Sequence, residues 1–359
     1  MKALPQPLMS YSPAGGCACK MPQSLLEEVT AFLGENGGLD EKLLVGLNPP
    51  DDAAVYAIDD HRALVITLDF LTPVVNDMYD WGRIAAANGL SDIYAMGARP
   101  LVALNILSCP PDFPKELLRQ LLAGGRDTII RAGALLAGGH SIVDARPKYG
   151  LAVVGEVDRK QIITKSGGRS GDVLVLTKAL GVGVISTAIK RGLASEADIC
   201  RATRTMVHLN AVARDIAVDL GVRAGTDVTG YGLIGHLHEM AVAAGQSATI
   251  FQDRVPAIAG VKALIRKGCT PDGSRRTLDS ALREGWLDPG ETAREQQLLL
   301  ADAQTSGGLL LAVARAEADS LVAALHAAGE REAAIVAEFT SDAPGRIALS
   351  RSSSRGGYT

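Results

Sequence analysis

Carboxylates occupy four places where the apolar pattern of this chain predicts a strand end or the protein interior. Such positions restrict the fold, because a buried carboxylate without a partner is energetically costly. The chain must therefore fold so that cations or hydrogen-bond donors reach these side chains. In chain order they are Asp51 and Asp52, Asp69, Asp92 and Asp227.

The same carboxylates predict a magnesium site. They come from separate elements, lack an accompanying histidine cluster, and have no basic neighbour beside Asp92 or Asp227. Oxygen donors of this kind suit Mg²⁺, which usually shares its ligands with substrate phosphates. A triphosphate near them would be repelled unless metal ions bridged the charges, so more than one Mg²⁺ is expected. The alternative is a set of separate caps and turns, in which Asp227 would cap the following helix.

A thiol and an ammonium lie together near the N-terminus, in the stretch Gly15-Gly16-Cys17-Ala18-Cys19-Lys20. The Lys20 cation can stabilise a thiolate at Cys17, the reactive form of cysteine, and it can also bind phosphate. Pro13 and the two glycines predict a mobile loop that a bound phosphate ligand could hold closed. The simpler alternative is a solvated, glycine-rich tail with incidental thiols.

Two glycine-rich segments raise the question of phosphate binding. Gly138-Gly139-His140-Ser141 is expected to follow a long helix, and its backbone amides could approach a phosphate closely. Taken alone, a helix cap and turn would explain it more simply. The segment 230–235 matches G-x-G-x-x-G, but the preceding Asp227 would face a pyrophosphate. We therefore interpret Gly230 and Gly232 as a tight helix entry.

The order of the apolar segments predicts an α+β fold rather than a doubly wound sheet, because strands and helices mix without a regular βαβ repeat. At 359 residues, two domains are expected. The expected parts are a flexible N-terminal loop at 1–22, an N-terminal domain at 23–158, a C-terminal α+β domain at 172–350 and a disordered tail at 351–359.

Individual elements can also be placed from the pattern. A helix is expected to begin with Asp80 as its N-cap, and another to begin at Pro114 and run into Gly138. The region after residue 245 carries no clear pattern up to residue 307. The expected strands are 53–58, 63–68, 101–107, 151–157, 172–176, 222–228, 308–314, 334–339 and 346–349, and the other helices are 25–33, 181–191, 203–220, 230–244 and 317–328.

Composition excludes several classes of function. A net charge of −4 gives no electrostatic basis for binding nucleic acid or an anionic membrane. No apolar run approaches the ~18 residues that a membrane span requires. The five cysteines are odd in number and scattered, which is not typical of a disulfide framework and predicts a reducing, cytoplasmic location.

These motifs, taken in order, resemble those of one family over nearly the whole chain. The family is selenophosphate synthetase, also called selenide, water dikinase, of the aminoimidazole-ribonucleotide-synthetase-like superfamily. The Cys17/Lys20 loop separates it from other ATP-using members. The motifs that carry the resemblance are Gly16-Cys17-Ala18-Cys19-Lys20, Asp51-Asp52-Ala53-Ala54-Val55-Tyr56, Thr67-Leu68-Asp69-Phe70, the segment 88–97, Gly138-Gly139-His140-Ser141, Thr226-Asp227-Val228-Thr229-Gly230-Tyr231-Gly232 and the segment 302–308.

The resemblance implies a fold, an assembly and a reaction. The fold would be a two-domain α+β structure, and the assembly a homodimer in which paired strands of the N-terminal domains form a barrel. The reaction would convert ATP, selenide and water into selenophosphate, AMP and phosphate, with Mg²⁺ as cofactor. Selenophosphate would supply activated selenium for selenocysteine and selenouridine. The resemblance further implies a catalytic role for the loop at 1–22 and ATP and Mg binding for the N-terminal domain at 23–158.

The resemblance also assigns residues, position by position. Cys17 and Lys20 match the catalytic thiol and ammonium. Since neither proline before Asp51 carries an N–H group, contacts there must use carbonyl or apolar atoms. The matched magnesium ligands are Asp52, Asp92 and Asp227. The matched nucleotide contacts are Lys20, Pro49, Pro50, Asp51, Asp69, Asp92, Gly139, His140 and Ser141.

Two other functions are compatible with parts of the pattern. A different ATP-dependent enzyme of the same superfamily, such as a small-molecule kinase or an amidine-forming synthetase, would use the carboxylates but leave Cys17 and Lys20 without a role. A non-catalytic selenium-binding or delivery protein would use Cys17 and Cys19 but leave the carboxylates unexplained.

Overall fold

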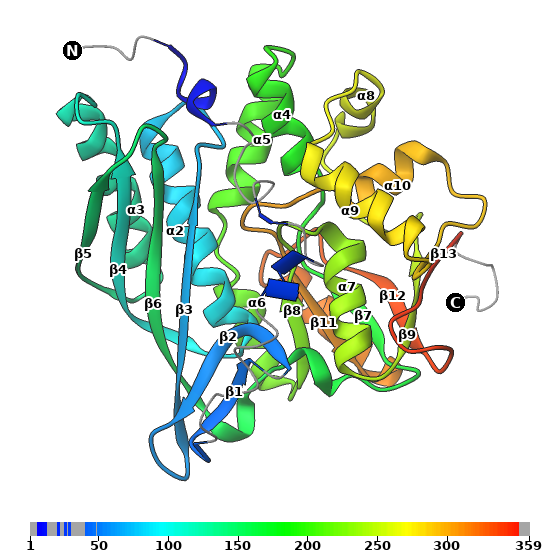
Figure 1. Ribbon diagram of the computed structural model, residues 1–359. Helices are drawn as coiled ribbons and strands as arrows, with labels where there is room; N and C mark the ends of the chain where they lie inside the picture. The colour runs from blue at the N-terminus through cyan, green and yellow to red at the C-terminus, as the bar shows by residue number, and fades with distance from the viewer. Residues whose placement is uncertain are drawn as a thin grey trace.

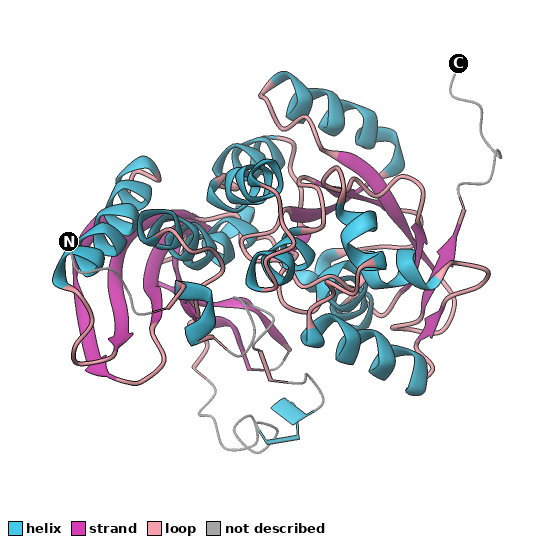
Figure 2. Cartoon of the chain, turned by 90° about the horizontal axis from the view of Figure 1, so that it is seen from above, coloured by secondary structure: helices cyan, strands magenta, loops and turns pink. Residues whose placement is uncertain are grey.

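The computed structural model describes residues 6–12, 20–21, 25–26, 28–29, 40–47 and 49–351. Two β-sheets lie toward opposite ends of the molecule, and helices from both halves of the chain lie between them (Figure 1; Figure 2). Cys17, most of the helix expected at 25–33 and the tail beyond residue 351 are outside the described residues. In the described part, no helix is long and apolar enough to cross a bilayer.

The first sheet has six strands in the order β1-β2-β3-β6-β4-β5. Neighbouring strands are antiparallel except β4 and β5, which are parallel. Helices α2 (Met78–Ala95) and α3 (Lys115–Arg131) lie beside this sheet and pack on each other (Figure 1). The strands are β1 (Leu43–Leu47), β2 (Pro50–Ala57), β3 (Arg62–Leu71), β4 (Arg99–Cys109), β5 (Leu135–Val143) and β6 (Lys148–Asp158).

The second sheet has seven strands in the order β10-β13-β9-β12-β7-β11-β8. Every residue of its neighbouring strands β7, β11 and β8 is buried, which explains their nearly continuous runs of apolar or small residues. The strands are β7 (Val173–Leu176), β8 (Ala224–Asp227), β9 (Ser247–Phe251), β10 (Leu287–Asp288), β11 (Leu309–Val313), β12 (Ala334–Thr340) and β13 (Ile347–Ser350). The α-helices are α4 (Val182–Lys190), α5 (Glu196–Val207), α6 (Ala211–Asp219), α7 (Gly232–Ala243), α8 (Val261–Arg266), α9 (Asp272–Arg283), α10 (Arg294–Leu300) and α11 (Ala318–Ala327).

Helix α2 is buried on nearly every side. It packs on the first sheet, on α3, and on α5 and β8 from the second half of the chain. Its contact with α3 is so close that a Cβ atom at Gly82 would lie 2.0 Å from the carbonyl oxygen of Leu121, so only glycine fits there. Asp77 caps the helix by accepting a hydrogen bond from the Asp80 backbone, so the expected cap, Asp80, lies in the first turn instead.

The structure corrects three further expectations. The helix expected at 203–220 is two helices, α5 and α6, because the chain turns at Asn210, whose side chain bonds to Ser91 and to the Gly307 carbonyl. Helix α3 ends at Arg131, and the segment 138–141 belongs to strand β5, because it pairs with β4. The unpatterned region after residue 245 forms β9, α8, α9, β10 and α10, several of which are too short to show a period.

The N-terminal residues before the Cys17/Lys20 loop are packed against the protein. A short 3₁₀ turn, Leu8–Tyr11, buries Leu8 and Met9, and Met9 donates to Asn76 Oδ1 at 3.0 Å. The Lys190 ammonium of α4 donates to the carbonyl oxygen of Ser12 at 2.5 Å. Residues 8–12 therefore have defined packing contacts, and the flexible loop expected over 1–22 stays a prediction.

The outer face of the first sheet is apolar and exposed. Along β3, Ile66, Leu68 and Phe70 alternate with inward-facing residues, and their exposed fractions are 44%, 60% and 47%. Strand β5 forms one edge of the sheet and is exposed along its whole length. Among the described residues the sheet is open and does not close into a barrel.

Candidate active site

The expected carboxylates converge around helix α2. Asp51 and Asp52 lie on β2, Asp69 on β3, Asp92 near the end of α2 and Asp227 at the end of β8. Helix α2 packs on all three strands, so segments far apart in sequence supply one group of side chains. Asp92 interacts electrostatically with Asp52, Asp69 and Asp227.

Asp52 forms a buried ion pair. The Lys165 ammonium lies 2.8 Å from Asp52 Oδ1, and Thr226 Oγ1 donates to the same oxygen at 2.9 Å. The other oxygen, Oδ2, is buried and has no hydrogen-bond partner among the described residues. One oxygen of this carboxylate is therefore engaged by protein groups, and the other can accept a ligand.

Asp227 is buried among other acidic groups. Burial, followed by the charge of Asp52, raises the pKa of Asp227, while a hydrogen bond with Ser91 and the charges of His236 and Lys20 act to lower it. Within the described chain, Asp227 Oδ2 has no hydrogen-bond partner, and the same is true of Asp52 Oδ2. Buried carboxylate oxygens of this kind require a cation or a proton.

Asp92 is repelled by three other carboxylates, Asp227, Asp69 and Asp52. It accepts a hydrogen bond from Thr67 Oγ1 at 2.5 Å. Burial, followed by the charges of Asp227, Asp69 and Asp52, raises the pKa of Asp92 well above its usual range. Carboxylates this close cannot all remain ionised without a counter-charge, so the group favours a bound cation.

The donor set fits Mg²⁺ bound together with a phosphate ligand. All the donors are carboxylate oxygens, and two of them are buried without partners in the described chain. Within the same residues, no three acidic, histidine or cysteine side chains are arranged to hold a metal ion by themselves. Mg²⁺ is usually held by one or two carboxylates, waters and substrate phosphates, so an incomplete protein cage suits a magnesium-nucleotide site.

Asp51 and Asp69 are oriented by hydrogen bonds. The Lys165 backbone N–H donates to Asp51 Oδ2 at 3.0 Å, and Asn88 Nδ2 donates to Asp69 Oδ2 at 2.5 Å. Burial, followed by the charge of Asp52, raises the pKa of Asp51 to about 6. Both carboxylates are thus fixed in direction at the border of the acidic group.

A chain of polar contacts joins Lys165 to Lys20. The Lys165 ammonium lies 3.3 Å from Glu239 Oε2, and His236 Nδ1 lies 3.2 Å from the same oxygen. His236 Nε2 is 3.2 Å from Thr229 Oγ1, to which the Lys20 ammonium donates at 3.4 Å. Burial acts to raise the pKa of Glu239, but the nearby charges of Lys165 and His236 lower it overall.

The segment 302–308 borders the site and contains a strained residue. Ser306 has a φ of 51° and is the only non-glycine residue with positive φ in the described part of the chain. Its backbone N–H donates to Asn88 Oδ1 at 2.8 Å, and its carbonyl accepts from the Lys178 ammonium at 2.9 Å. These bonds offset the strain and tie the segment to helix α2.

The predicted nucleotide contacts Gly139, His140 and Ser141 do not join the carboxylates within one chain. They lie on the edge strand β5, and β6 and β4 separate β5 from β3. Three strand spacings amount to about 14 Å. Pro49 and Pro50 are exposed at the start of β2, next to Asp51.

Sequence reasoning missed the residues that neutralise and orient the carboxylates. Lys165 lies in a polar, glycine-containing segment whose composition is typical of a domain linker. His236 and Glu239 lie three residues apart on the apolar helix α7. Two ionisable side chains at that spacing on an otherwise buried helical face are the signal that could have found them.

Comparison with known proteins agrees with this architecture. Residues 50–157 match the family model of the AIR synthase related protein, N-terminal domain, and residues 169–349 match that of the C-terminal domain. Two similar solved structures are tt0281 from Thermus thermophilus (TM-score 0.68, 19% identity) and the HypE–HypF complex (TM-score 0.65, 16% identity). The first match covers 91% of this chain and the second 92%, and each includes 96% of the chain of the solved structure. At these identities the similarity concerns the fold alone.

Curated relatives are much closer in sequence. The selenide, water dikinase of Myxococcus xanthus (strain DK1622) is 45% identical over 340 residues, which are 94% of this chain and 96% of the relative. That of Photorhabdus laumondii subsp. laumondii is 42% identical over 343 residues, 95% of this chain and 97% of the relative. With such identity across both halves of an AIR synthase-like α+β fold, the chain belongs to the selenide, water dikinase family.

Proposed function

We propose that this protein makes selenophosphate from ATP, selenide and water, and releases AMP and phosphate. The observation that carries the proposal is the gathering of carboxylates beside Lys20 in a chain of this family. The carboxylates suit the metal that phosphoryl transfer needs, and Lys20 suits the phosphates. Selenophosphate would then supply activated selenium for selenocysteine and selenouridine.

Asp52, Asp92 and Asp227 are the proposed magnesium ligands. When bound, Mg²⁺ would neutralise the carboxylates and the phosphates of ATP together. The unpartnered Oδ2 atoms of Asp52 and Asp227 support this role, and Lys165 orients Asp52 through its other oxygen. The chain then contributes mainly by positioning, which is what phosphoryl transfer requires of a protein.

Lys20 is proposed to hold phosphate oxygens during transfer. Its ammonium donates to Thr229 Oγ1 and acts electrostatically on Asp227, so it lies at the border of the acidic group. A cation at this place can balance negative charge that develops on the phosphates. Cys17 is the proposed essential thiol, and Lys20 would stabilise its thiolate. Because Cys17 lies outside the described residues, the resemblance alone supports its role.

A homodimer is proposed to complete the nucleotide site. Within one chain, the three proposed contacts on β5 are about 14 Å from β3. A second copy that places its β5 beside β2 and β3 would bring these residues next to Asp51 and Asp69, the other proposed contacts. The exposed side chains of Leu68 and Phe70 support this pairing, because contiguous apolar surface marks an interaction site. Strands paired across two open sheets would form the expected barrel.

A cytoplasmic location is part of the proposal. Cys109, Cys200 and Cys269 are free thiols, which suits a reducing compartment. Selenide is itself a reduced species, so the same compartment suits the substrate.

Anaerobic incubation with Mg-ATP and selenide, followed by phosphorus NMR, tests the function. Selenophosphate, AMP and phosphate should form in equal amounts. ADP as the end product would indicate a small-molecule kinase instead, and absence of turnover would indicate a selenium-binding protein. Cys17→Ser should abolish selenophosphate formation, because a hydroxyl is a far poorer nucleophile, and Cys19→Ser is the matched control that should retain it.

A further inference from the structure

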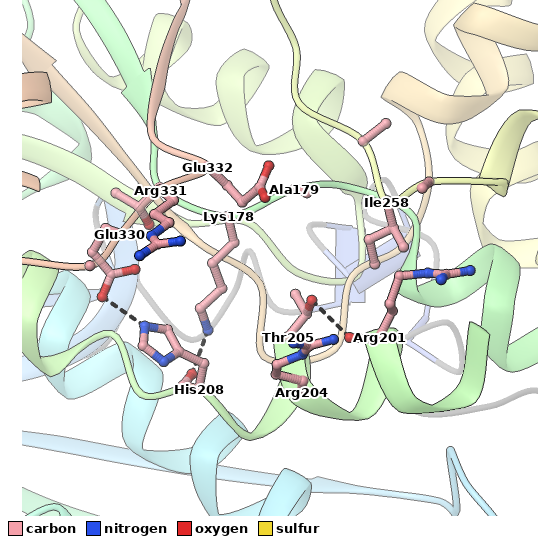
Figure 3. A pocket seen from close by; sticks show the side chains of 14 residues that line it. Lys178, Ala179, Arg201, Arg204, Thr205, His208, Ile258, Glu330, Arg331 and Glu332 are labelled. Atoms are coloured by element: carbon pink, nitrogen blue, oxygen red, sulfur yellow. Dashed lines mark hydrogen bonds and ion pairs between the residues drawn. The ribbon is translucent and has the colours of Figure 1, made fainter. Parts of the chain in front are cut away.

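A pocket of about 480 Å³ opens between helix α5, the segment after β7 and the turn before β12 (Figure 3). Lys178 follows β7, Arg201 and Arg204 lie on α5, and Arg331 lies in the turn. The apolar segment 257–259 completes the lining. This volume is typical of a small-molecule site, and none of these residues has a role in the proposed reaction.

Three guanidinium groups line the pocket, and two of them have no ion-pair partner among the described residues. Within the described chain, no carboxylate pairs with Arg204 or Arg331. Arg201 pairs with Asp198 at 2.7 Å, but its Nε is buried without a hydrogen-bond partner in the described residues. Since guanidinium groups match the geometry of phosphate and carboxylate oxygens, these unpaired heads suit an anionic ligand.

The acidic side chains of the pocket do not cancel this charge. They are Glu330 and Glu332, whereas four basic side chains line the same space. Glu330 already accepts a hydrogen bond from His208 at 2.7 Å, as Figure 3 shows. The pocket therefore keeps an excess of unpaired positive groups.

Lys178 adds a buried ammonium to this lining. Its side chain is 4% exposed, and Nζ donates to the carbonyl oxygens of His208 at 2.6 Å and Ser306 at 2.9 Å. An ammonium has three donors, and the third has no acceptor among the described residues. Burial lowers the pKa of Lys178 to about 7, so an anion beside it would favour its charged form.

We propose that this pocket binds a small organic phosphate, with Lys178, Arg204 and Arg331 as its cationic contacts. A phosphate dianion suits a pocket lined by several cations, and the apolar segment 257–259 suits the organic part of such a ligand. The pocket shares Lys178 with the segment 302–308, since Lys178 holds the Ser306 carbonyl on the border of the acidic group. The site is therefore adjacent to the carboxylates but built from residues of opposite charge.

Isothermal titration of the full chain with glycerol 3-phosphate tests the proposal. EDTA is included so that the carboxylates hold no metal ion and therefore repel the anionic probe. Glycerol is the uncharged control. We expect saturable binding with one site per chain, and no binding of glycerol. The double variant Arg204→Ala/Arg331→Ala should weaken binding at least tenfold, because both cations contact the phosphate.

The variant Arg119→Ala/Arg283→Ala is the matched control. It removes the same charge from two exposed helical positions, with side-chain exposures of 78% and 71%, and should bind as the native protein does. Equal weakening in both double variants, or no saturable binding at millimolar probe, would overturn the proposal. A titration with succinate tests whether the pocket prefers a carboxylate. If succinate binds as tightly as glycerol 3-phosphate, the proposed phosphate ligand is rejected in favour of a carboxylate.

Discussion

The ammonium of Lys165 lies 2.8 Å from Oδ1 of Asp52, and both side chains are buried, with exposures of 10% and 5%. Lys165 belongs to the connection between the two sheets, and Asp52 to β2. Burial acts to lower the pKa of Lys165, but the charges of Asp52, Glu239 and Asp51 raise it well above its usual range. The protein thus supplies a permanent cation to the carboxylates that are proposed to receive Mg²⁺.

Lys165→Met should therefore destabilise the protein and impair turnover. The change leaves Asp52 and Glu239 as buried charges without their cation, which costs about 3–5 kcal/mol in free energy of unfolding. We expect turnover to fall more than tenfold, because Asp52 loses its orientation. Urea unfolding and AMP release measure the two effects. Lys160→Met, at an exposed position on the same connection, should stay within about 0.5 kcal/mol of the native protein, and a similar loss there would contradict the argument.

Asparagine in place of Asp52, Asp92 or Asp227, one at a time, should remove most turnover and leave the fold intact. Since Asp92 is repelled by its neighbours, Asp92→Asn should unfold at the same or a higher temperature than the native protein in EDTA. Turnover across a Mg²⁺ titration and thermal unfolding by circular dichroism measure these outcomes. Asp112→Asn is the exposed control. Native activity with unchanged Mg²⁺ dependence in two of the three variants would reject the ligand assignment.

Asp302 should make stability depend on pH. Burial raises the pKa of Asp302 to about 7, from 3.8 in the absence of burial. The folded form therefore holds a proton that the unfolded form releases, so the free energy of unfolding falls as pH rises from about 4 to about 7. Asp302→Asn removes this titration. As pH rises from about 4 to about 7, the free energy of unfolding of the variant should therefore increase relative to that of the native protein, by up to about 4 kcal/mol.

Urea unfolding of both proteins at about pH 4 and pH 8 measures this gain. Asparagine can still accept from the Gly183 and Val184 N–H groups, as Asp302 does. Any change in those bonds affects both pH values alike, so the difference between them reports the titration. Asp272→Asn, which removes an exposed carboxylate, is the control, and parallel pH profiles for the native protein and Asp302→Asn would refute the prediction.

Leu68→Asp should produce a monomer. Leu68 is 60% exposed on the outer face of β3, where a partner sheet is proposed to pack, and a buried charge there opposes association. Light scattering after gel filtration should show half the native mass, together with a loss of turnover. Val242→Asp, at an exposed position on α7, is the matched control. A native protein that is already monomeric and active would contradict the dimer.

The carboxylates could be predicted from sequence because an acidic residue inside an apolar run is unusual wherever the run folds. Lys165 could not be predicted, because its role depends on a contact between the connection of the two sheets and strand β2, and its local composition is that of a linker. The same limit explains the helix expected at 203–220. The first helix ends at Val207, and Asn210, which precedes the second, reaches Ser91 on α2, a contact that no local pattern encodes.

The segment 138–141 shows a related limit. Its glycines indicated a close backbone approach, and a Cβ atom at Gly139 would indeed lie 2.2 Å from the Asn105 carbonyl oxygen. The approach is to the neighbouring strand β4, however, and it is the strand order that places the segment away from the carboxylates. Sequence identified the unusual backbone, but only the sheet shows what it contacts.

Helix α2 carries Asn88, Ser91 and Asp92 and is enclosed by packed elements, with the Gly82–Leu121 contact too tight for any side chain. The conformational entropy of these polar side chains is therefore lost during folding, before any substrate binds. Binding energy need not be spent on arranging this part of the site. Differences in affinity among members of such a fold should then arise from the segments around α2, while the helix itself acts as a fixed reference against which substrates are aligned.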